Sequence, residues 1–252
     1  PKAQMLGGLS IFGSAFFLYL STVVIRWAED RVTIDPSYFL FARFILGFAV
    51  VSAAVAARGR RPKVHRWHFL LGRTLANTLS VFCFYKAVSL TTVAEANILN
   101  MTYPLFVTVF SWIFFSKQRD FPATLILMVA LVGVWLVLSP SRIGFHVGNL
   151  WGLASGISAA AAILYLNLCR RDHDTHTILF IMFGLGSLLI FLLFREHIFL
   201  PDRREILFLF ACAGFGVIGQ YLLTIGFRYV TAVEGSIVSS SRILLAAVLG
   251  PY

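Results

Sequence analysis

Six charged side chains stand inside long apolar runs, and they are the residues of this chain most able to do chemistry. Four are cations and two are anions: Arg43, Arg73, Lys86, Glu95, Glu234 and Arg242. A charge near the middle of a bilayer costs at least roughly 2.5–3.5 kcal/mol, so such residues usually face a cavity or a partner. Arg242 lies deepest in its run, and a guanidinium binds a carboxylate through two parallel hydrogen bonds. This pattern predicts a site for an anionic group. The alternative is a structural charge held by backbone carbonyls or by Glu234.

Uncharged polar residues add to this prediction. Asn97, Asn100 and Pro104 are spaced i, i+3 and i+7, which places them on one face of a helix, and Tyr103 lies beside them. Because proline has no N–H, the carbonyl of Asn100 is left as a free acceptor. Amide groups would be unpaired in lipid, so this face is expected to look into protein or water. Polar contacts between helices are the alternative.

The predicted site combines these residues with weaker candidates. The predicted substrate-binding residues are Asn97, Asn100, Tyr103, Ser239, Arg242, Gln220 and Arg43. Glu95 and Glu234 lie near the ends of their runs, where they are expected to be structural acids or to exchange a proton.

Catalytic and metal sites are not expected. The histidines all lie in loops or at their edges: His65, His68, His146, His173, His176 and His197. The three cysteines, Cys83, Cys169 and Cys212, form no CxxC pair, and the chain has no P-loop. The sequence therefore predicts no catalytic residue, no metal and no cofactor, and a protein that is not an enzyme.

The elements that carry these residues are expected to be membrane helices. Hydrophobic residues make up 59% of the chain and charged residues 13%. A span needs about 20 apolar residues. Nine runs meet this requirement: Leu6–Ile25, Pro36–Ala57, Phe69–Leu90, Val93–Phe115, Phe121–Leu138, Val147–Leu168, Thr177–Phe194, Ile206–Phe227 and Val230–Tyr252.

The second half of the chain repeats the first. At a spacing of 139 residues, Thr92 aligns with Thr231 and Glu95 with Glu234. We expect a first unit of five helices over residues 1–140 and a second over 147–252, whose tenth helix would lie beyond this sequence. Because five is odd, the second unit enters the membrane from the opposite side. The predicted fold is an all-α integral membrane protein of two inverted-topology five-helix repeats.

The positive charge of the chain fits a membrane better than a nucleic acid. The net charge is +10, and most cations sit in short clusters between apolar runs, above all at 58–66. With the N-terminus in the cytoplasm, eleven cations lie on the cytoplasmic side and six outside. We expect that orientation and no nucleic-acid partner.

The sequence resembles the drug/metabolite transporter superfamily with two EamA-type repeats. The likeness rests on FLFARFILGF (39–48), on FYKAVSLTTVAEANILNMTYPLFVTVFSWIFF (84–115) and on the echo of that stretch from Thr224 onward. The resemblance implies ten-helix carriers with both termini in the cytoplasm. It also implies export of amino acids or related metabolites across a bacterial inner membrane.

The expected function is secondary active transport by alternating access. The substrate would be a small polar or amphipathic metabolite, such as an amino acid or a related organic anion or zwitterion, because cations outnumber acids in the spans. The expected partners are that substrate and the lipid bilayer, with possible proton coupling through Glu95 or Glu234. The alternative is a receptor or scaffold that keeps the fold without transporting.

Overall fold

The part of the chain that the structure describes is helical and contains no strand. The computed structural model describes residues 2–29, 31–59, 62–91, 93–114 and 147–242, with single residues at 125, 128, 129, 132 and 245. Its helices are α1 (Lys2–Glu29), α2 (Pro36–Ala57), α3 (Trp67–Leu90), α4 (Val93–Asn100), α5 (Tyr103–Phe114), α7 (Val147–Asp172), α8 (Thr175–Phe194), the 3₁₀ turn η2 (Arg195–His197), α9 (Arg203–Gly226) and α10 (Ala232–Ser239). Most of the predicted span 121–138, and the end of the predicted ninth span, lie outside the described residues.

Several helices begin at side chains that satisfy their first backbone N–H groups. Asp35 accepts a hydrogen bond from the backbone of Ser37, and Asp202 and Glu205 form a capping box at the start of α9. Between such ends, five helices of the described part are long and apolar enough to cross a membrane: Lys2–Ala28, Pro36–Ala57, Val147–Asp172, Thr175–His197 and Arg203–Gly226.

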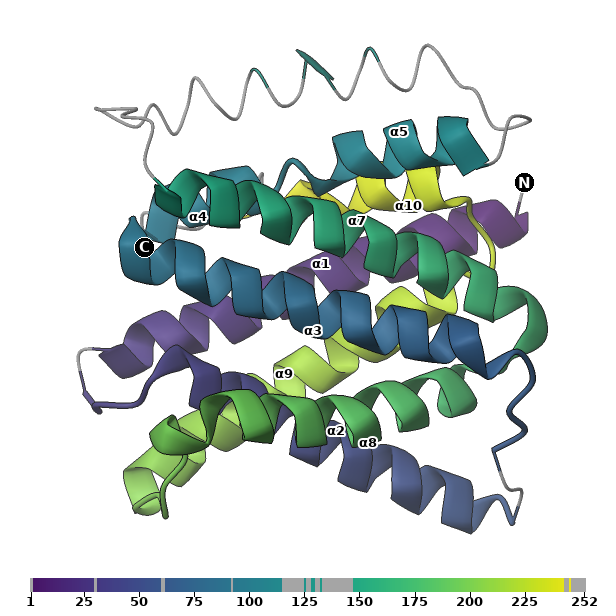
Figure 1. The fold of residues 1–252 in the computed structure, drawn as a ribbon. Coiled ribbons are helices and arrows are strands. Elements are labelled where there is room, and N and C mark those ends of the chain that lie inside the picture. The colour runs from purple at the N-terminus through teal and green to yellow at the C-terminus, as the bar shows by residue number, and fades with distance from the viewer. Residues whose placement is uncertain are drawn as a thin grey trace.

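The helices of the two repeats exchange equivalent contacts. The most extensive contacts join α3 with α7 and α1 with α9. In repeat terms, these are the third helix of one unit against the first helix of the other, in both directions. Figure 1 shows α1 and its counterpart α7 running in opposite directions across the bundle. The all-helical fold with two inverted repeats is therefore confirmed.

The predicted span from Val93 to Phe115 is broken in two. Helix α4 ends at Asn100 and α5 begins at Tyr103, so the expectation of one continuous helix was wrong. The second repeat breaks at the equivalent place, since α10 ends at Ser239, 139 residues after Asn100. Only the first copy has a proline there, so Pro104 is not the common cause.

Hydroxyl side chains mark both breaks. The Thr102 hydroxyl donates to the Leu99 carbonyl at 2.6 Å, and the Ser240 hydroxyl donates to the Ile237 carbonyl at 2.6 Å. Such local bonds offer the backbone an alternative to continuing the helix. Helix α7 closes on the first break through Gly156, where a Cβ atom would lie 2.8 Å from the Thr102 hydroxyl. The slim surface of α7 thus lets the broken helix approach closely.

Candidate functional site

The two helix breaks meet, and they do so through paired contacts. The Tyr103 hydroxyl lies near Ser239 and Arg242, and the Arg242 Nη2 donates to the Met101 sulfur at 3.6 Å. Tyr103 and Arg242 are equivalent in the repeat, and each one contacts the other copy beside its break. This reciprocal arrangement is what a local twofold axis produces. Thioether sulfur is a weak acceptor, so the Arg242 guanidinium keeps most of its capacity to donate.

Arg43 of α2 brings a second cation to this region. Its aliphatic stem fills the space that a side chain on Gly216 of α9 would need, and its guanidinium carbon lies 5.7 Å from the centre of the Phe44 ring. The charge of Arg43 is close enough to that of Arg242 to repel it. Among the described residues, neither guanidinium pairs with a carboxylate. Arg43 and Arg242 are therefore interior cations that no described acid neutralises, and the buried Arg73 of α3 is a third.

Two other predicted site residues make contacts between helices. The Asn100 amide donates to the Ser155 hydroxyl on α7 at 2.5 Å, and the Gln220 amide donates to the Met182 sulfur on α8 at 3.7 Å. Both side chains thus have protein partners, as the alternative of polar contacts between helices predicts. The side chain of Asn97 lies outside the described residues.

Glu234 caps the start of α10. Its carboxylate accepts from the Thr231 backbone N–H at 2.9 Å and from the Gln4 amide at 2.8 Å. It forms a capping box with Thr231, so pairing between Glu234 and Arg242 is not the arrangement found. Glu95 occupies the equivalent place in the first turn of α4.

Sequence reasoning missed two features of this region. Met101 contacts Arg242, although nothing about a methionine in an apolar run points to a site. Gly216 makes room for Arg43 from a helix far away in the chain. The repeat alignment was the available signal for Met101, because that residue aligns with Ser240 at the second break.

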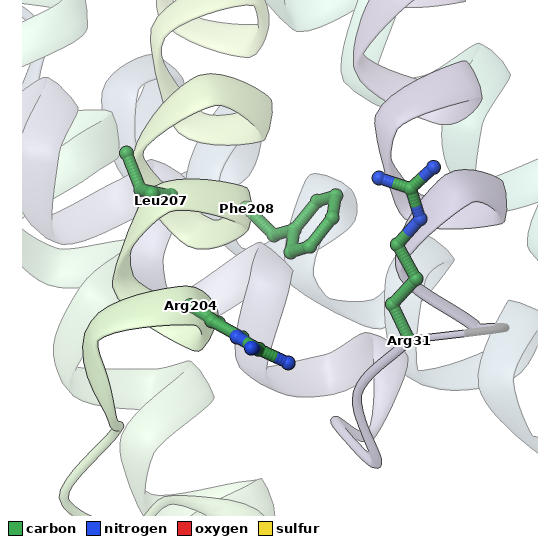
Figure 2. A pocket seen from close by; sticks show the side chains of 4 residues that line it. All are labelled: Arg31, Arg204, Leu207 and Phe208. Atoms are coloured by element: carbon green, nitrogen blue, oxygen red, sulfur yellow. The ribbon is translucent and has the colours of Figure 1, made fainter.

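Pockets open at the two ends of α9. At its start, Arg31, Arg204, Leu207 and Phe208 line a pocket of about 560 Å³. Figure 2 shows the Phe208 ring extending from α9 toward Arg31. A pocket of about 620 Å³ lies at the other end of the helix, where Tyr221, Ile225 and Arg228 meet the turn between α7 and α8.

A protein-family model settles what this arrangement is. The model of the EamA-like transporter family matches the chain twice, over residues 5–139 and 146–252. The chain belongs to the EamA-like transporter family. It is accordingly a multi-pass membrane protein, and the recognition of EamA-type repeats in the sequence is confirmed.

Relatives of this EamA-like chain are transporters rather than enzymes. The pseudopaline exporter CntI of Pseudomonas aeruginosa is 24% identical over 226 residues, which cover 89% of this chain and 78% of the exporter. An uncharacterized transporter of Archaeoglobus fulgidus is 28% identical over 188 residues, covering 74% and 65% of the two chains. One solved crystal structure shares the fold, with a TM-score of 0.75 at 20% sequence identity. The superposition covers 99% of this chain and 89% of the chain in that structure.

Proposed function

We propose that this EamA-like protein is a secondary carrier that exports a small anionic or zwitterionic metabolite, such as an amino acid or a related organic acid. The observation that carries the proposal is the pair of interior cations, Arg43 and Arg242, which no described carboxylate neutralises. An unpaired buried charge is costly, and a bound anion relieves that cost. Tyr103 and Ser239, which lie near each other, supply neutral hydroxyl donors beside the second cation.

The proposed mechanism is alternating access between the units 1–140 and 147–252. Both helix breaks lie where the units meet, and the Arg242 contact there is with a weak acceptor. A carboxylate that binds the Arg242 guanidinium replaces its contact with the Met101 sulfur by stronger, charge-assisted hydrogen bonds. Ligand binding is thus coupled to the contact between the repeats, which rearranges when the cavity changes sides.

The cation-rich 58–66 loop favours an orientation in which that loop and the N-terminus face the cytoplasm. A single cysteine at Lys63 tests this orientation, because the native cysteines Cys83, Cys169 and Cys212 are buried and give little background. A membrane-impermeant maleimide should label that cysteine only after cells are opened. Labelling from outside intact cells would reverse the orientation.

Purified full-length chain in liposomes tests transport itself. Labelled amino acids and organic anions should cross the bilayer, whereas organic amines of similar size should not. If uptake by the unmodified protein responds to an imposed pH gradient and uptake by Glu95→Gln does not, proton coupling is assigned to Glu95. A protein that binds an anion and moves none is a receptor or scaffold instead, and refutes the carrier proposal.

A further inference from the structure

A strongly basic pocket lies where α2, α7 and α9 end and α8 begins. Its volume is about 620 Å³, and four arginines line it: Arg58, Arg170, Arg171 and Arg228. Arg58 comes from the first repeat and the other three from the second. The pocket lies at the opposite end of α9 from the pocket lined by Arg31 and Arg204, so it is a separate place in the molecule.

The acids of the basic pocket are already engaged. The Asp172 carboxylate lies 3.4 Å from the Arg66 guanidinium, and the Asp174 carboxylate accepts from the Thr177 backbone N–H at 3.2 Å, where it caps α8. Helix ends offset part of the remaining charge, since each contributes about half an elementary charge, negative at a C-terminus and positive at an N-terminus. Three C-termini and one N-terminus together offset about one positive charge, and the Asp174 carboxylate, which attracts Arg170, offsets another. The pocket keeps a net positive charge.

Two buried nitrogen atoms of the pocket have no hydrogen-bond partner in the described part of the chain. They are the Nε of Arg170 and the Nδ1 of His176. Arg170 is held in place, because its Nη1 donates to the Thr175 hydroxyl at 3.0 Å and to the His173 carbonyl at 3.4 Å. A guanidinium fixed in this way loses little freedom when it binds an oxyanion in the pocket.

We propose that this basic pocket binds a phosphate group, supplied either by a soluble phosphate or by the headgroup of an acidic phospholipid. Cations approach from three helix ends, which suits a tetrahedral group with several charged oxygens better than a flat carboxylate with two. Basic pockets between membrane helices are a recurrent place for anionic headgroups. Tyr221 and Ile225 add an apolar wall that suits the lipid form.

The full-length protein tests both sources with defined probes. Inorganic phosphate is titrated onto protein in detergent, and thermal stability is compared in nanodiscs of phosphatidylcholine with and without phosphatidylglycerol. The test variant, R58Q/R228Q, removes two exposed arginines of the pocket. The control, R31Q/R204Q, removes the same charge from exposed arginines at the other end of α9.

We expect the R58Q/R228Q variant to lose about tenfold or more in affinity for one probe, and the control to lose little. A loss with inorganic phosphate in detergent assigns a soluble phosphate. A loss confined to the phosphatidylglycerol nanodiscs assigns a lipid headgroup. The proposal is overturned if neither probe binds the unmodified protein, or if both variants weaken binding equally.

Discussion

Replacing Arg242 by methionine separates a binding role from a structural one. Among the described residues, the guanidinium donates a hydrogen bond only to the Met101 sulfur, at 3.6 Å, and no carboxylate pairs with it. A carboxylate ligand would accept two charge-assisted hydrogen bonds, each contributing about 1.5–3 kcal/mol. Their loss should raise the Kd for the anion by a factor of about 10² to 10⁴.

The same substitution should leave folding intact. Breaking a buried ion pair costs about 3–5 kcal/mol because it leaves an uncompensated charge. No described acid pairs with Arg242, so the substitution leaves no carboxylate uncompensated. The Tm of Arg242→Met should therefore be unchanged or higher. Arg242→Lys keeps the charge without the planar fork, so it should lose most of the affinity as well. Arg203→Met, which removes an exposed cation at the start of α9, should change neither quantity.

Calorimetric binding and thermal unfolding are measured on the same preparations in liposomes or detergent. Unchanged anion affinity and transport in Arg242→Met would refute the role of this arginine in binding. A large fall in Tm with little loss of affinity per folded molecule would also contradict the reasoning, because it would assign the residue to the fold.

Three further experiments test the packing and the hydrogen bonds of the structure. Gly216→Ala places a Cβ atom on the stem of the α2 arginine and should weaken anion binding by about tenfold or more. Gly214→Ala meets nothing within 4 Å and should instead add about 0.5–1 kcal/mol of stability, so equal effects of the two would contradict the packing. A double-mutant cycle of Asn100→Ala and Ser155→Ala should give a coupling of about 0.6 kcal/mol in unfolding experiments, and no coupling would exclude their hydrogen bond. Burial raises the pKa of the Asp174 carboxyl, but hydrogen bonds with Thr177 and the nearby His176 together outweigh this effect and lower the pKa. Asp174→Ala should therefore cost about 1 kcal/mol at neutral pH, and the difference should shrink as the pH falls through that lowered pKa, whereas a constant difference would exclude the ionised cap.

The sequence alone determined the class of fold, because membrane insertion depends on a local property. The lengths of the apolar runs predicted α1, α2, α3, α7, α8 and α9, and the 139-residue spacing predicted the repeat. The helix ends differ by a few residues, as between the predicted Leu6–Ile25 and the observed Lys2–Glu29. Backbone hydrogen bonding continues past the last apolar side chain, so hydropathy does not mark the end of a helix.

The break in the fourth span was only half visible in the sequence. Pro104 suggested a free carbonyl at Asn100, but the second copy has no proline and breaks at the matching residue, Ser239. Serine and threonine hydroxyls that bond to the preceding turn occur in many continuous helices. Their presence therefore does not predict a break until a neighbouring helix such as α7 is seen to pack against it.

The partners of the polar side chains were decided only by the tertiary structure. The sequence identified Arg43 and Arg242 as charges in apolar surroundings, since their cost in lipid is independent of what they touch. It did not predict that Asn100 turns to Ser155, or that Gln4 reaches Glu234 across 230 residues. Such contacts depend on the rotation of each helix about its axis and on the helix beside it. Both are set by the packing of side chains far apart in the chain, which no local pattern records.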